Sequence, residues 1–121
     1  EEELAAGINR YEGKYKNTYE SVCRTFEGDA VKIVKGVVPD TLSQCSSDRI
    51  AFLSIDMNCV LPEIAAAEFF LPKMQPGSVI VLDDYGFPKH IHQKIAFDRF
   101  AAEKGLNILS LPTGQGIIFI K

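Results

Sequence analysis

Short apolar runs alternate with stretches of helical periodicity along most of the chain. The runs are rich in Val, Ile and Leu and are bounded by glycine, proline or polar residues, which is typical of strands. Five strands are predicted, at residues 30–35, 50–55, 78–82, 106–111 and 116–120. Helices are predicted at about residues 17–26, 61–74 and 88–104, and a further short helix is predicted to begin at residue 39.

This alternation predicts an α/β fold with a mostly parallel sheet, because strand–helix–strand units form right-handed crossovers. The nearly continuous apolar run at 50–55 is typical of a strand covered on both faces, so we expect helices on both faces of the sheet. The short linker between the last two strands predicts an antiparallel C-terminal hairpin. We expect a single domain over residues 1–121, with a helical N-terminal segment at 1–28 and an α/β core at 29–121.

Apolar side chains recur at helical spacing in two of the predicted helices. In the first, Tyr19, Val22 and Phe26 would form a stripe that faces the core, continuing from Tyr15. The last helix has a similar stripe with Phe97 at its centre and ends before a glycine. Both helices are therefore expected to pack on the sheet.

Composition narrows the classes of function. The chain carries a net charge of −3, which argues against a nucleic-acid-binding protein, because such proteins need a basic surface. No apolar run is long enough to span a membrane. Three cysteines without a CxxC motif favour a reducing compartment, and we expect a cytoplasmic protein. The chain begins with neither Met nor a signal peptide, which suggests a trimmed or partial chain.

Three acidic residues follow two of the predicted strands. Asp83 and Asp84 come directly after the run at 78–82, and Asp56 comes directly after the run at 50–55. The carboxyl ends of neighbouring parallel strands lie about 4.8 Å apart at one edge of a sheet, where open α/β proteins bind ligands. Three carboxylates there would suit a hard cation such as Mg²⁺ or Ca²⁺. The alternative is that these acids only cap the helices that follow.

Other polar residues give weaker signals. His90 and His92 lie two apart at the start of a helix, so they point in different directions and do not share a metal. His90 is a candidate acid, base or substrate contact, or else an exposed residue of the first helical turn. Tyr85 would line a pocket or, more simply, pack as an aromatic. The Thr-Gly-Gln-Gly sequence at 113–116 precedes a strand instead of a helix, so it is not a phosphate-binding loop.

The stretch from Ile50 to Gly86 resembles the macrocin O-methyltransferase family. The similarity lies in Leu53-Ser-Ile-Asp-Met-Asn and, after one helix, in Pro76-Gly-Ser-Val-Ile-Val-Leu-Asp-Asp-Tyr-Gly. The family has an aspartate after one strand and then a "PGG-x-hydrophobic-DDY" segment at the same spacing. Its members are class I S-adenosylmethionine-dependent methyltransferases, and many methylate sugar hydroxyls. The resemblance thus implies a Rossmann-like sheet, S-adenosylmethionine as cofactor and a small-molecule hydroxyl as acceptor.

Site residues follow from the resemblance position by position. The family's three metal-binding aspartates fall on Asp56, Asp83 and Asp84, and their Mg²⁺ would orient the acceptor and lower the pKa of its hydroxyl. Asp56 is also the implied candidate for general base, with His90 as a second catalytic candidate. The loop that packs against adenine in the family falls at Gly36-Val37-Val38, so Gly36 and Val37 are the expected cofactor contacts.

The chain departs from the family pattern in ways that affect its expected state. Asn58 replaces a second acid, and Val60 replaces an aromatic residue. The family's first strand and its glycine-rich cofactor loop lie before the region that this chain covers, so the chain resembles the C-terminal half of a methyltransferase. The absent strands would lie between the strand at Val31 and the strand at Phe52, which leaves apolar edges open. We expect these strands to pair directly, or the chain to dimerise or to need the missing N-terminal half.

Two other functions stay open at this point. A receiver-like signalling domain also uses three acids and Mg²⁺, but its acidic doublet comes from the first strand and its single Asp from a later one, the reverse of this chain. The second alternative is a non-catalytic α/β module that mediates oligomerisation. Such a module would retain this part of the sheet but would have no catalytic activity.

Overall fold

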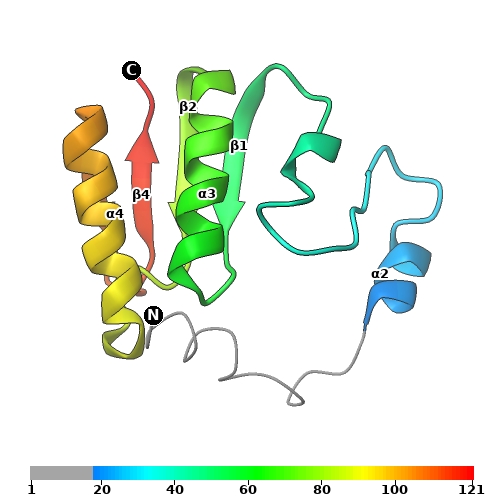
Figure 1. Ribbon diagram of the computed structural model, residues 1–121, viewed down its shortest axis with the longest axis horizontal. Helices are drawn as coiled ribbons and strands as arrows, with labels where there is room; N and C mark the ends of the chain where they lie inside the picture. Colours follow the sequence, from blue (N-terminus) through cyan, green and yellow to red (C-terminus); the bar gives the residue numbers. More distant parts are fainter. Residues whose placement is uncertain (1–17) are drawn as a thin grey trace.

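The computed structural model describes residues 18–121 (Figure 1). Its α-helices are α2 (Tyr19–Thr25), α3 (Val60–Phe70) and α4 (Ile91–Lys104). Its strands are β1 (Ile50–Ile55), β2 (Met74–Leu82), β3 (Ile108–Ser110) and β4 (Gly116–Phe119). Three 3-10 turns complete the elements: η1 (Leu42–Gln44), η2 (Leu71–Lys73) and η3 (Pro88–His90). Within residues 18–121, no helix is both long and apolar enough to cross a bilayer.

The strands form one sheet in the order β1-β2-β4-β3. β1 and β2 run parallel, whereas β4 is antiparallel to both of its neighbours. Three strands therefore point the same way, and the predicted mostly parallel sheet with a C-terminal antiparallel hairpin is confirmed. The register pairs Ile55 with Leu82 and Leu82 with Gly116. The carboxyl ends of β1 and β2 and the start of β4 thus meet at one edge of the sheet.

Helices α3 and α4 pack against each other on one face of the sheet (Figure 1). Both crossovers step across the sheet in the same direction, and right-handed crossovers in one direction put their helices on one side. The prediction of helices on both faces is therefore wrong for residues 18–121. On the opposite face the side chains of Phe52, Leu109 and Phe119 are 64%, 54% and 55% exposed.

The hydrophobic core fills the space between the sheet and these two helices. Its largest fully buried side chains are Ile80 of β2, Phe97 of α4 and Ile118 of β4. The predicted apolar stripe of the last helix is confirmed, because Phe97 and Phe100 are both buried. Gly105 ends α4 in a left-handed conformation with φ 66°, which glycine adopts without steric cost.

The N-terminal part of the described chain differs from its predictions. Residues 30–35 form no strand, because a β-branched run needs a partner strand for its backbone groups and none lies beside it among residues 18–121. The expected pairing of Val31 with the strand at Phe52 is therefore also wrong. α2 forms where a helix was predicted, but none of its residues is buried, so its core-facing stripe is wrong too. Tyr15 and the rest of residues 1–17 lie outside the described residues.

Candidate functional site

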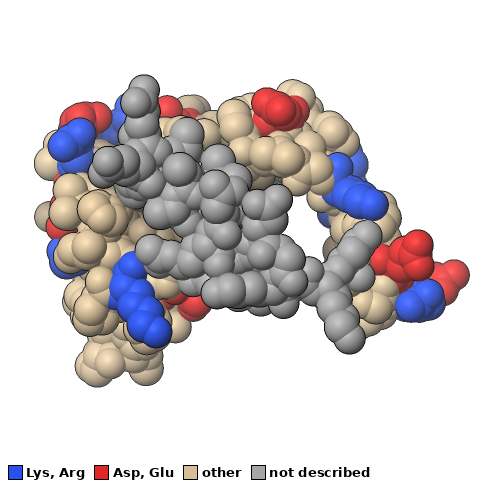
Figure 2. All heavy atoms as spheres, turned by 60° about the horizontal axis from the view of Figure 1, so that its bottom comes forward, with Lys and Arg blue, Asp and Glu red and all other residues tan. Residues whose placement is uncertain are grey.

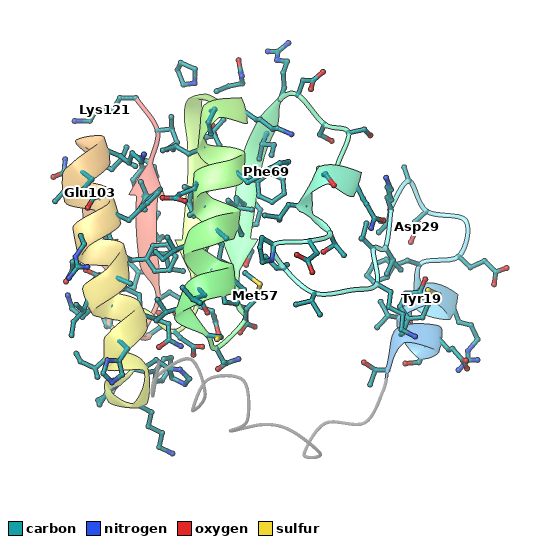
Figure 3. The ribbon with its side chains drawn as sticks, in the orientation of Figure 1. Tyr19, Asp29, Met57, Phe69, Glu103 and Lys121 are labelled. Carbon is teal, nitrogen blue, oxygen red and sulfur yellow. The ribbon has the colours of Figure 1, made fainter. Side chains whose placement is uncertain are left out.

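The loops after β1 and β2 meet at the carboxyl edge of the sheet. The backbone N–H of Asp83 donates to the carbonyl of Ile55 at 3.0 Å, which carries the parallel ladder one residue past the two strands. Met57, in the loop after β1, lies beside the start of α3 (Figure 3). The fold therefore brings the segment that follows Ile55 next to Asp83 and Asp84, as the strand order predicts.

Asp84 is the most unusual residue of this edge. Its side chain is 13% exposed, and its Oδ2 atom is buried without a hydrogen-bond donor among the described residues. Burial raises the pKa of Asp84, the charges of Asp56 and Asp83 raise it further, and His90 opposes the shift. Buried carboxylate oxygens normally have partners, because leaving one without a donor costs about 1–3 kcal/mol. Oδ2 of Asp84 thus accepts no hydrogen bond within residues 18–121, although Nδ1 of His90 lies 3.7 Å away.

The other two predicted ligands differ in their surroundings. Asp83 is half-buried, and its Oδ1 accepts a hydrogen bond from Nε2 of Gln115 at 3.1 Å, whereas Asp56 is exposed. Within residues 18–121, no group of three or more His, Cys, Asp or Glu side chains is spaced to hold a metal ion. The three acids gather at one edge and supply the oxygen donors that a hard cation prefers, without a preformed cage.

His90 is buried at the start of α4, so the alternative of an exposed histidine is wrong. Its Nδ1 lies 3.7 Å from Oδ2 of Asp84 and 2.9 Å from Nε2 of Gln93. His90 therefore lies between Asp84 and Gln93, and the direction of its hydrogen bond with Gln93 depends on the ring tautomer. His92 is exposed. The two histidines therefore lie in different surroundings.

Glu63 supports the loop after β1. Its side chain is buried, and its Oε1 accepts hydrogen bonds from the backbone N–H groups of Met57 (3.2 Å) and Cys59 (3.4 Å). Burial raises the pKa of Glu63 to about 7, the hydrogen bonds oppose this, and the charge of Asp84 adds to it. Between the two donors, Asn58 adopts φ 56°, a left-handed conformation that asparagine tolerates better than most residues.

Glu63 is not among the site residues predicted from the sequence. The available signal was an acidic residue in the first turn of a helix, where side chains often accept hydrogen bonds from exposed backbone N–H groups. That signal predicts a cap, and here the same carboxylate also reaches back to Met57. Glu63 therefore holds the turn that directly follows Asp56.

The hairpin loop at 112–116 lies against the acidic loop at 83–87. The backbone N–H of Gly86 donates to the carbonyl of Gly114 at 2.6 Å. A Cβ atom at Gly116 would come within 2.7 Å of the ring of Tyr85, so this position has room only for glycine. Gln115 was not identified as a site residue, because its contact with Asp83 follows from the register of β2 and β4 and not from any local motif.

Tyr85 packs in the core, which confirms the simpler of its two interpretations. Its ring is buried, and its hydroxyl donates to Oδ1 of Asp98 at 2.5 Å and accepts from Nζ of Lys94 at 3.1 Å. Burial and the hydrogen bond to Asp98 raise the pKa of Tyr85. Tyr85 thus connects the acidic loop to α4.

Gly36 and Val37, the expected cofactor contacts, lie in the loop before η1. The side chain of Val37 is 70% exposed, and its carbonyl accepts from both the backbone N–H and the hydroxyl of Thr41 at 3.0 Å each. A Cβ atom at Gly36 would come within 2.3 Å of Thr41 Cγ2. These contacts shape the loop locally and leave Val37 open to solvent.

The described surface carries both signs of charge. Figure 2 shows basic and acidic side chains interspersed among uncharged ones on this view of the molecule. None of Cys23, Cys45 and Cys59, all within residues 18–121, forms a disulfide, as the sequence predicts. The side chain of Cys59 is buried.

Comparison with known proteins places the chain in a family. The solved structure of the O-methyltransferase NovP superposes with a TM-score of 0.70 and 21% sequence identity, over 84% of this chain and 44% of NovP, which shows a shared fold. The chain thus spans less than half the length of that relative, and no curated protein matches it significantly. The macrocin-O-methyltransferase (TylF) family model matches residues 16–110, most of the chain. The chain therefore belongs to the macrocin O-methyltransferase family.

Proposed function

We propose that this chain is the carboxylate-bearing part of an S-adenosylmethionine-dependent O-methyltransferase. Its acceptor would be a hydroxyl of a sugar or another small natural product. The observation that carries the proposal is the buried Oδ2 of Asp84, which accepts no hydrogen bond within residues 18–121 and lies near Asp56 and Asp83, in a chain of this family. A fold retains such a costly atom when a ligand satisfies it.

Mg²⁺ is the cation that we propose for this edge, with Asp56, Asp83 and Asp84 as its ligands. The chemistry of the donors supports the choice, because all three are carboxylates and Mg²⁺ prefers oxygen. When bound, the cation would supply positive charge that orients the acceptor hydroxyl and lowers its pKa. The cation would also contact Oδ2 of Asp84, which accepts no hydrogen bond within residues 18–121.

Two residues are proposed to act on the acceptor. Asp56 is the only one of the three acids that is exposed, so it is accessible to a substrate hydroxyl and would accept its proton as general base. His90 lies beside Asp84 with Nδ1 in contact with Gln93, so Nε2 is the ring nitrogen that we propose to contact a substrate oxygen. Both roles concern orientation and proton transfer, since methyl transfer itself is a direct displacement at the sulfonium carbon.

The methyl donor is proposed to contact Gly36 and Val37. The exposed Val37 side chain supplies apolar surface of the kind that packs against adenine. Residues 18–121 have no glycine-rich loop between a strand and a helix, the feature that usually holds such a cofactor. We therefore propose that this chain supplies only part of the donor site.

A complementary half of a methyltransferase domain is the partner that we propose for the uncovered face of the sheet. Phe52, Leu109 and Phe119 expose apolar surface there, and the outer edge of β1 has no neighbouring strand among residues 18–121. NovP contains more than twice the length that this chain matches, so a partner of that kind would cover both the face and the edge. A reducing compartment such as the cytoplasm is proposed for this assembly, because the three cysteines are unbridged.

Calorimetric titration with Mg²⁺ tests the site. Asp84→Asn should weaken Mg²⁺ binding by at least about tenfold, because even outer-shell changes at metal sites cost that much. Asp29→Asn, an exposed acid far from the edge, is the matched control and should bind like the wild type. Equal affinity of Asp84→Asn and the wild type would contradict the proposal and favour the non-catalytic oligomerisation module.

Two further measurements test the proposals that the chain holds only part of the donor site and that its partner is a complementary half-domain. Titration with S-adenosylmethionine should give weak binding to the 121-residue chain alone, and tight binding would show that the chain holds a complete donor site. Light scattering should show no stable dimer of the isolated chain. A dimer that Phe119→Lys dissociates would identify a second copy, instead of a complementary half, as the partner of the sheet face.

A further inference from the structure

We infer that Gln115 is a positioning residue for Asp83, and that the hairpin loop 112–116 is the platform that fixes the acidic loop 83–87. The inference rests on the proposed function, because it concerns how one proposed cation ligand is held. It assigns a role to the Thr-Gly-Gln-Gly sequence, which no nucleotide-binding pattern explains.

The contact that carries the inference joins two strands at the site edge. Nε2 of Gln115 donates to Oδ1 of Asp83 at 3.1 Å, and both residues are half-buried. The pairing of Leu82 with Gly116 places the two residues opposite each other, one step past the last ladder pair. The amide fixes the rotation of the carboxylate by occupying one oxygen, which leaves Oδ2 of Asp83 for a ligand.

Gln115 is itself held by the backbone of its loop. Its carbonyl accepts from the N–H of Leu111 at 2.8 Å, and the carbonyl of Leu111 accepts from the N–H of Gly114 at 3.1 Å. The loop then joins the acidic loop through the 2.6 Å hydrogen bond from Gly86 N–H to the carbonyl of Gly114. The donor that reaches Asp83 is thus supported on both sides, which is what a preorganised site requires.

Close packing between the two loops shows that they fit as a unit. A Cβ at Gly86 would come within 2.9 Å of the Gly114 carbonyl oxygen, and a Cβ at Gly114 within 2.6 Å of the Phe87 ring. The same limit holds at Gly116 against Tyr85. A hairpin turn alone needs no such fit to a neighbouring loop, so the three glycines bring the platform close enough for Gln115 to reach Asp83.

Mg²⁺ titration by calorimetry on the 121-residue chain tests the role. Gln115→Met keeps the length of the side chain and removes the donor, and it should weaken Mg²⁺ affinity by about 10–100-fold, the cost of losing an outer-shell partner. Gln44→Met changes an exposed glutamine in η1 and should leave the affinity unchanged. Wild-type affinity in Gln115→Met would overturn the inference and leave the proposed cation site standing.

A measurement without cation separates this inference from the proposed function. In nitrogen-15 spectra of the metal-free chain, Asp83→Asn should shift the side-chain amide signals of Gln115, whereas Asp56→Asn should not. Unmoved signals in Asp83→Asn would overturn the inference whatever the chain binds. Shifted signals in a chain that binds no Mg²⁺ would uphold the positioning contact and contradict the proposed cation.

Discussion

Two parts of the molecule contrast in how firmly they are packed. Residues 50–121 contain every buried side chain of the described chain, the four-stranded sheet and all three acids of the proposed site. Residues 18–49 contain no buried side chain and no strand, and they supply Gly36 and Val37, the expected cofactor contacts. The ribbon shows the same division, with α2 lying apart from the sheet (Figure 1).

This difference indicates which part of the proposed function the chain can support by itself. The acids lie on loops held by Glu63, Gln115 and Tyr85, all of which belong to the packed part. Among the described residues, the hydrogen bonds of Val37 are local ones to Thr41, so few interactions oppose the local opening of this loop. Cation binding is therefore expected of the chain alone, whereas full donor binding is expected to need more protein around residues 18–49.

Replacing one phenylalanine in each part should change the stability by very different amounts. Phe97→Ala deletes a fully buried ring and should lower the free energy of unfolding by about 3–5 kcal/mol. Phe26→Ala, the matched control with its ring 42% exposed, should change it by about 0.5 kcal/mol or less. Urea unfolding followed by circular dichroism measures both. A large loss in Phe26→Ala would show that residues 18–49 are part of the folded core.

Glu63 should make the stability of the packed part depend on pH. The pKa of Glu63 is raised from 4.5 to about 7, so its contribution is fully present below pH 4.5 and is lost as the pH rises through about 7. From pH 4.5 to pH 8 this group should lower the free energy of unfolding by about 3 kcal/mol. Urea unfolding at several pH values measures the change.

Two substitutions on α3 isolate this effect. Glu63→Gln keeps an oxygen acceptor for Met57 and Cys59 but cannot ionise, so its advantage over the wild type should grow as the pH rises. Glu68→Gln changes an exposed acid of the same helix and should follow the wild-type curve. Parallel curves for Glu63→Gln and the wild type would show that Glu63 is not a buried titrating group.

The close packing between the hairpin loop and the acidic loop predicts a smaller loss of stability. Gly116→Ala places a methyl group against the Tyr85 ring and should lower the free energy of unfolding by about 1–3 kcal/mol. The same change in a Tyr85→Ala background should cost much less, because the ring that opposes the methyl group is gone. Equal costs in both backgrounds would place the strain elsewhere than at Tyr85.

The elements that sequence predicts well are those whose signals are local. Helical periodicity and the stop at Gly105 locate α4, and apolar runs between breakers locate β1 and β2. The run at 30–35 has the same strand composition but no partner strand, so local propensity overestimates it. Whether a strand forms there depends on pairing, which no single segment encodes.

The same reason explains why some residues of the proposed site can be predicted from the sequence and others cannot. Asp56, Asp83 and Asp84 are predicted by position, because Asp56 directly follows β1 and the pair Asp83-Asp84 directly follows β2. Gln115 is missed, because its partner lies in another strand and only the pairing of Leu82 with Gly116 reveals it. Finding it requires the register of the sheet, which follows from packing.

Paramagnetic broadening by Mn²⁺ tests the central claim most directly. Mn²⁺ takes oxygen ligands as Mg²⁺ does, and it broadens amide signals of nearby residues in nitrogen-15 spectra of the 121-residue chain. We predict that the signals of Met57, Tyr85 and Gly86 broaden first, that those of Tyr19 and Asp29 stay sharp, and that Asp84→Asn abolishes the pattern. Broadening centred on residues 18–49, or a pattern unchanged in Asp84→Asn, would contradict a cation site at the carboxyl edge of the sheet.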